Sequence, residues 1–156
     1  MAIYMKYADI KGPVTTDGFK DWIELNSFTW AASRAIGSAR GTFHSREHSS
    51  PALSEVTVTK HTDLSSPKLF LESGAGKLDN KVTLNFTTTT KGKTETFLTY
   101  ELTKAGLSGY SLSSQGDMPT ESLRLNFTKI SKTFADPAAG GSPETVGYDL
   151  TQMKTI

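Results

Sequence analysis

The stretch that decides the fold is Lys60-His61-Thr62-Asp63-Leu64-Ser65-Ser66-Pro67-Lys68-Leu69-Phe70. It contains a helix start in a sequence that otherwise consists of strand patterns and turns. Ser66 is expected to be the N-cap, because its hydroxyl can accept a hydrogen bond from an amide of the first turn. Pro67 suits the first helical position, where its missing N–H costs nothing.

The predicted helix covers residues 67–73 and is short. We expect it to end at Gly74 or Gly76, because glycine adopts the left-handed C-cap conformation most easily. A helix of about two turns is not stable alone. Its apolar side chains must therefore be buried against a sheet or against a neighbouring subunit; they are Leu69, Phe70 and Leu71.

Alternating apolar and polar residues elsewhere predict half-buried strands. Residues 82–87 and 121–130 are the clearest examples, and both contain Leu-Asn-Phe-Thr. We interpret this recurrence as two strands in similar settings on facing halves of one structure. Residues 3–7 and 53–60 predict further strands, and residues 22–36 predict one long or bent strand.

Turn residues divide these strands. Lys91-Gly92-Lys93 predicts a hairpin, residues 105–109 predict a corner, and residues 137–143 predict a turn before a last strand over 145–153. About eight strands at this spacing are typical of a sandwich or barrel. We therefore expect one mainly β domain over residues 1–156, a compact two-sheet β-barrel with one short flanking helix near residues 66–74.

The composition excludes several classes of protein. The net charge is +1, which gives no strong field for nucleic acid or an anionic membrane. Cysteine is absent, so there is no disulfide, thiolate metal site or thiol nucleophile. No apolar run approaches the ~18 residues that a membrane span requires, and the start of the chain does not resemble a signal peptide.

Catalytic and metal-binding patterns are weak. His44 and His48 have the i, i+4 spacing of helical metal ligands, but a Gly- and Ser-rich segment holds them. Gly74-Ala75-Gly76-Lys77 lacks the Ser or Thr that a phosphate loop needs after its lysine. The carboxylates Asp17, Asp21 and Glu24 are typical of solvated side chains. We expect no enzyme activity, cofactor or metal.

One segment is too long for a simple connection. Residues 37–51 are mostly polar and span ~15 residues, where compact domains usually need ~4–6. Such loops are usually functional or disordered. This segment contains five charged or imidazole side chains: Arg40, His44, Arg46, Glu47 and His48.

The whole chain resembles the haemolysin-coregulated protein (Hcp) family, which forms the inner tube of bacterial type VI secretion systems. The resemblance rests on the order and spacing of four segments. They are Tyr4–Gly12, the Ser-Phe-aromatic segment Trp22–Trp30, the Lys-x-x-Asp-x-x-Ser-Pro-x-Leu signature Lys60–Leu69, and Glu-x-Leu-x-Leu-x-Phe-x-Lys-Ile at Glu121–Ile130. Residues 37–51 differ widely among such proteins.

The resemblance implies a β-barrel of the phage tail-tube type with one helix on its flank. Six copies would form a ring, rings would stack into a tube, a contractile sheath would surround the tube, and a spike would cap it. Small effectors would bind in the ring lumen. The protein would be made in the bacterial cytoplasm and secreted by this machine. Because the chain ends at Ile156, soon after the last predicted strand, we expect cargo to bind non-covalently.

Candidate interface residues follow from the resemblance and from the polar segment. For ring packing and stacking we select Arg40, Arg46, Glu47, His48, Asp63, Ser66 and Pro67. Two other classes of function stay open. A monomeric β-barrel that binds a ligand in its interior would have a cavity, and a hydrolase using Asp and His residues would lose activity on a single substitution such as His48→Ala.

Overall fold

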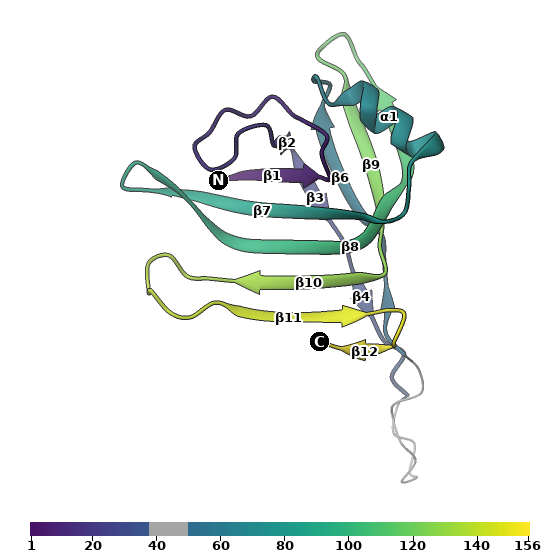
Figure 1. Ribbon diagram of the computed structural model, residues 1–156, viewed down its shortest axis with the longest axis vertical. Helices are drawn as coiled ribbons and strands as arrows, with labels where there is room; N and C mark the ends of the chain where they lie inside the picture. Colours follow the sequence, from purple (N-terminus) through teal and green to yellow (C-terminus); the bar gives the residue numbers. More distant parts are fainter. Residues whose placement is uncertain (38–49) are drawn as a thin grey trace.

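A computed structural model describes residues 1–37 and 50–156 of the chain (Figure 1). The described part contains one helix and twelve strands. In chain order they are β1 (Ala2–Tyr7), β2 (Ile23–Leu25), β3 (Ser27–Thr29), β4 (Ala32–Ser33), β5 (Ala52–Leu53), β6 (Val56–His61), α1 (Ser66–Ala75), β7 (Asn80–Thr90), β8 (Lys93–Ser113), β9 (Thr120–Asn126), β10 (Lys129–Phe134), β11 (Glu144–Asp149) and β12 (Lys154–Thr155).

The strands form two main sheets that share β8. The first sheet has the order β12-β11-β10-β8-β7-β1-β2, and every neighbouring pair in it is antiparallel. The second sheet has the order β3-β6-β9-β8 and crosses the first at a steep angle in Figure 1. A separate pair is formed by β4 and β5. The prediction of two sheets with one flanking helix is confirmed, but the sheets do not close into a barrel.

Strand β8 joins the two sheets because it bends without breaking. Its first half pairs with β7 and β10, and its second half pairs with β9. The register shifts between Leu107 and Gly109, as in a β-bulge. Gly106 lies where a Cβ would be 3.2 Å from the Lys77 carbonyl oxygen and would collide with Leu78. The chain therefore changes direction at residues 105–109 as predicted, but by a bend within β8 and not by a turn that separates two strands.

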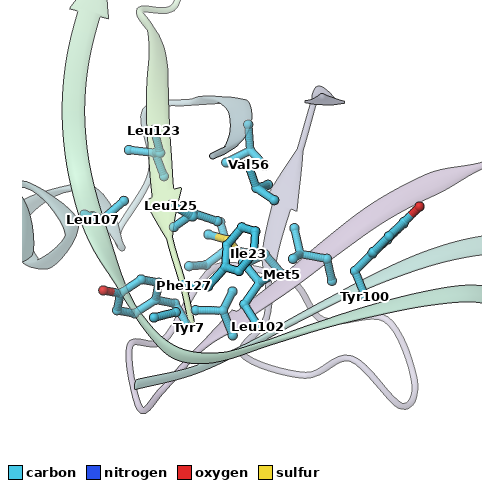
Figure 2. Packing of buried hydrophobic residues seen from close by; sticks show 14 of the residues in the cluster. Met5, Tyr7, Ile23, Val56, Tyr100, Leu102, Leu107, Leu123, Leu125 and Phe127 are labelled. Carbon is cyan, nitrogen blue, oxygen red and sulfur yellow. The ribbon is translucent and has the colours of Figure 1, made fainter. Parts of the chain in front are cut away.

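The hydrophobic core lies between the two sheets (Figure 2). Figure 2 shows side chains of both sheets pointing toward one another. Leu84 of β7 and Leu125 of β9 are both fully buried in it. The two leucines thus occupy similar settings in opposite sheets, but the rest of the two Leu-Asn-Phe-Thr segments differs: residues 84–87 all lie in β7, whereas β9 ends at Asn126, so residues 121–130 are not one strand. Other fully buried members are Met5, Tyr7, Ile23, Val56, Val58, Leu69, Val82, Leu102, Ala105 and Leu123.

Helix α1 begins one residue earlier than the sequence predicts. Ser65 is the N-cap, without a side-chain cap hydrogen bond, so the assignment of Ser66 as N-cap is wrong. The helix ends at Ala75, and the C-cap Gly76 is extended rather than left-handed, with φ −73°. Of the three apolar side chains expected to be buried, only Leu69 is.

Two other expectations need correction. Residues 22–36 are not one strand but contain β2 of the first sheet, β3 of the second sheet and β4 of the separate pair. The last strand is shorter than expected, because β11 ends at Asp149 and a turn leads to β12. The hairpin at Lys91-Gly92 is confirmed: Thr90 pairs with Lys93, and both turn residues have positive φ.

Candidate assembly surfaces

A buried ion pair links the two strands next to the start of α1. Lys60 of β6 and Glu121 of β9 are direct cross-strand partners, and the distance from Lys60 Nζ to Glu121 Oε1 is 3.3 Å. Both side chains are fully buried. Removing two charges from water is costly, so such a pair is stable only when further hydrogen bonds satisfy its remaining polar atoms.

Those further hydrogen bonds come from the signature segment and from β8. Lys60 Nζ lies 3.1 Å from Asp63 Oδ1 and donates to the Ser66 hydroxyl at 3.3 Å. The Ser66 hydroxyl donates to Glu121 Oε1. The Tyr110 hydroxyl donates to Glu121 Oε2 at 3.0 Å. Both carboxylate oxygens of Glu121 are therefore paired, and the first turn of α1 is fixed to the second sheet.

Two tyrosines near α1 have hydroxyl groups with a raised pKa. Burial, followed by the hydrogen bond to Glu121 and the charge of Glu121, raises the pKa of Tyr110 to about 12. Near the end of the helix, the Tyr7 hydroxyl donates to Glu72 Oε2 at 3.3 Å. Burial, then the charge and hydrogen bond of Glu72, raise the pKa of Tyr7 to about 12. Both hydroxyls therefore stay protonated donors: that of Tyr7 holds the last turn of α1 through Glu72, and that of Tyr110 completes the pairing of Glu121 on β9.

The candidate residues chosen from the sequence fall into two groups. Asp63 and Ser66 join the buried cluster, whereas Pro67 is exposed at the helix start. The other four candidates, Arg40, Arg46, Glu47 and His48, lie outside the described residues. A direct role of Asp63 and Ser66 in ring packing stays a prediction; the contacts they make here are within the chain.

Sequence reasoning did not select Lys60, Tyr110 or Glu121 as functional residues, although two of them had a detectable signal. Lys60 continues the buried face of Val56 and Val58, and Glu121 begins the buried face of Leu123 and Leu125. A charged residue at an apolar position of a strand pattern indicates a buried partner of opposite charge. Two such positions of opposite sign predict the pair. Tyr110 had no such signal.

One face of the first sheet is polar and faces away from the core. The paired registers place hydroxyl and amide side chains side by side across four strands: Thr83, Asn85, Thr99, Ser131, Thr133 and Thr145. Its charges are matched, because Lys81 lies 3.4 Å from Glu101 and Lys129 is opposite Asp149. At β1 the face ends in a small apolar cluster around Tyr4 and Phe19. The face is thus broad, hydroxyl-rich and nearly neutral.

An apolar groove lies on the other face of this sheet, at the end that β12 closes. It has a volume of about 350 Å³, and its lining includes Trp30, Leu53, Tyr100, Ile130, Val146 and Tyr148. The groove exists because the second sheet does not extend over β10 and β11, and β4 and β5 cover that region only in part. Val146 is consequently 53% exposed.

The outer surface of α1 is also apolar. Phe70 and Leu71 of the helix are 63% and 65% exposed, and Leu64, two residues before the helix starts, is 60% exposed beside them in the sequence. Phe70 contacts the ring of Tyr110 edge-on, with centroids 5.5 Å apart, but most of its surface faces outward. A short helix that presents two large apolar side chains to solvent is typical of an interaction surface.

Other kinds of site have no support in the described residues. Residues 1–37 and 50–156 contain no group of three or more His, Cys, Asp or Glu side chains placed to hold a metal ion. His44 and His48 lie outside these ranges, so their suggested pairing stays untested. Within the same ranges, no helix has the length and apolarity for crossing a membrane.

Comparisons with known proteins agree with these features. The sequence profile described as "Type VI secretion system effector, Hcp" matches residues 4–134. No curated protein matches the chain. A solved "type six secretion system protein" is 24% identical, with a TM-score of 0.88 over 99% of both chains.

Two further solved structures have the same fold. Hcp1 from Salmonella typhimurium is 21% identical, with a TM-score of 0.75 over 99% of both chains. A type VI secretion system effector from Yersinia pestis is 17% identical, with a TM-score of 0.75 over 94% of this chain and 98% of that chain. At these identities the structures establish the fold, and the profile, which spans most of the chain, establishes the family. The chain therefore belongs to the Hcp family of the type VI secretion system.

Proposed function

We propose that this protein is a structural component that builds the inner tube of a type VI secretion system. Six copies form a ring, and rings stack into the tube. The observation that carries the proposal is the family match over residues 4–134 together with a first sheet that has a strand paired on one side only at each end. In the described structure β2 pairs only with β1 and β12 pairs only with β11.

Unpaired edges support a ring for a physical reason. An exposed strand edge is a template for pairing with another chain. A cyclic ring joins one edge of each subunit to the different edge of the next, so each subunit needs two unlike surfaces at opposite ends. In Figure 1, β1 and β2 lie near the top of the first sheet, and β12 lies at its bottom. Six such subunits can close without leaving an edge.

The polar face of the first sheet is the proposed channel wall. When the sheet edges meet neighbours, one face of the sheet points into the ring and the core stays on the other side. Hydroxyl groups at positions such as Thr99 and Thr133, with paired charges such as Lys81 and Glu101 beside them, give a polar surface. Such a surface suits transient contact with small effectors, because it offers hydrogen bonds without strong adhesion.

The remaining partners follow from the family and are proposals for this chain. A contractile sheath surrounds the tube, a spike caps it, and contraction secretes the tube from the bacterial cytoplasm. Residues 37–51 are proposed to contact the next ring in the stack, with Arg40, Arg46, Glu47 and His48 as the candidate contacts. This role is structural, and no catalytic residue, cofactor or metal is part of it.

The apolar groove supports a second candidate function. A β-protein that binds a small ligand would need an apolar site with few polar groups, and the groove beside Trp30 and Tyr100 has that character. This alternative predicts a monomer, since the ligand rather than a second copy would cover the groove.

Solution mass distinguishes the two functions. Light scattering of the purified protein should give six times 16.9 kDa, about 101 kDa, or a multiple of it. Negative-stain images of the same fraction should contain annular particles. A mass of 16.9 kDa across a wide concentration range would overturn the tube proposal and favour the ligand-binding protein.

A further inference from the structure

The apolar groove and the outer surface of α1 lie at opposite ends of the molecule. The longest axis is vertical in Figure 1, with α1 at the top and with β4 and β12, which border the groove, toward the bottom. The helix cannot reach the groove of its own chain. Each chain therefore presents one apolar projection at one end and one apolar recess at the other.

This arrangement matches what a head-to-tail interface requires. Leu71 is 65% exposed on the helix, and Val146 is 53% exposed in the groove. Burying large apolar side chains of this kind removes apolar surface from water, which favours association. When the helix surface of one copy contacts the groove of the next copy, both apolar surfaces are buried in one interface. A ring repeats that interface between every two neighbouring subunits.

Charge complementarity supports the same pairing. The last turn of α1 contains no basic residue, and Glu72 lies in it. The carbonyl end of a helix carries a partial negative charge, so a cation from elsewhere is favourable there. The groove supplies one: Lys132 lines it, and its Nζ lies 5.9 Å from the centroid of the Tyr100 ring.

We propose that, in the ring, the outer surface of α1 of one copy seats in the groove of the next copy. The contact brings Leu71 and its neighbours against Val146 and Trp30, and it brings the end of the helix toward Lys132. This inference rests on the proposed ring and specifies how its subunits are joined. It also explains why the sandwich stays open beside β10 and β11: the next subunit supplies the missing layer.

Engineered cysteines test the contact without interference from other thiols, because the chain contains no cysteine. Leu71→Cys and Val146→Cys are made separately and together, and a short bifunctional maleimide links thiols that lie close. Thr145→Cys replaces Val146→Cys in the matched control. Thr145 is the adjacent residue of β11, and its side chain lies on the opposite, polar face.

A head-to-tail contact predicts a specific pattern of products. Neither single variant links to itself. An equimolar mixture of Leu71→Cys and Val146→Cys gives linked pairs, and the double variant gives a ladder that ends at six chains. The double variant with Thr145→Cys gives no ladder. Links within the Leu71→Cys protein alone would overturn the inference, because they place two helices against each other.

The oligomeric mass of each sample separates this inference from the proposed function. A ring of about 101 kDa without links between positions 71 and 146 overturns the helix-in-groove contact and leaves the tube intact. A monomer without links overturns both.

A second measurement is independent of cross-linking. Leu71→Asp should raise the concentration at which half of the protein is in rings by at least about tenfold, and adding Val146→Lys should recover most of that change. An unchanged assembly concentration for Leu71→Asp would contradict the contact.

Discussion

Lys60 on β6 and Glu121 on β9 stand directly opposite each other and form a fully buried ion pair, with 3.3 Å between Nζ and Oε1. Two residues along the same strands, on the same face, the partners are the buried Val58 and Leu123. The pair therefore occupies a core position, and Ser66 connects it to the first turn of α1. The position of the helix, and of the apolar surface that it carries, depends on this pair.

Breaking the pair should be costly, whereas replacing both members should not be. Glu121→Leu leaves the charge of Lys60 buried with one carboxylate fewer, and we expect a loss of about 3–5 kcal/mol in the free energy of unfolding. Lys60→Met combined with Glu121→Leu should recover much of that loss. Urea unfolding at one fixed protein concentration measures both, because assembly makes stability depend on concentration.

The exposed pair of Lys81 and Glu101 is the control for this experiment. Their side chains are 66% and 43% exposed, so Lys81→Ala should change the free energy of unfolding by less than about 1 kcal/mol. If Glu121→Leu cost no more than Lys81→Ala, the buried pair would not be the anchor of α1.

The raised pKa of Tyr110 predicts how its contribution depends on pH. The folded pKa of about 12 lies above the usual value near 10, so the folded state keeps the proton longer than the unfolded state. The stabilisation is fully present below pH 10 and is lost as the pH rises from 10 toward 12. The destabilisation caused by Tyr110→Phe should therefore shrink over this range in urea unfolding. A cost that grew with pH there would contradict the hydrogen bond to Glu121.

Pro67 should stabilise the start of α1 through the unfolded chain. It is exposed and lies in the first turn of the helix, where its fixed φ suits the helix. Pro67→Gly adds backbone freedom to the unfolded state, and we expect a loss of about 1 kcal/mol, seen as a lower melting temperature. An unchanged melting curve would show that the proline does not contribute. Gly74→Ala is the matched control in the same helix. A Cβ at this position meets no other atom, and alanine favours the helix more than glycine does, so this variant should raise the melting temperature.

Bulky labels on the two faces of the first sheet should have opposite effects on assembly. Thr99→Cys, modified with a large maleimide, should still form rings, because Thr99 lies on the polar face proposed to line the channel. Val146→Cys with the same label should stay monomeric, because the label fills the groove. Light scattering of the labelled proteins checks both. Loss of rings on labelling Thr99→Cys would place subunit contacts on the polar face.

Much of this fold was predictable because local patterns agree with the final structure. The hairpin at Lys91-Gly92 follows from its turn residues, and the strands containing Leu84 and Leu125 follow from their alternation. The family followed from four spaced segments. Each of these features is decided by residues close together in the sequence.

The features that the sequence did not predict depend on distant contacts. Ser66 has the sequence character of an N-cap, but its hydroxyl is used by Glu121, which lies 55 residues away, and Ser65 takes the cap position. Gly106 has the character of a turn residue, but the nearby Lys77 carbonyl explains why glycine is needed inside β8. The groove and the exposed surface of α1 arise only when the sheets are assembled.

Electron cryo-microscopy of the assembled protein tests the central claim most directly. We predict a six-fold ring in which the first sheet continues from one subunit to the next, the polar face carrying Thr99 lines the channel, and α1 of each subunit lies in the groove beside Val146 of its neighbour. Particles without rotational symmetry, or a ring in which α1 is exposed to solvent and the groove is empty, would contradict this account.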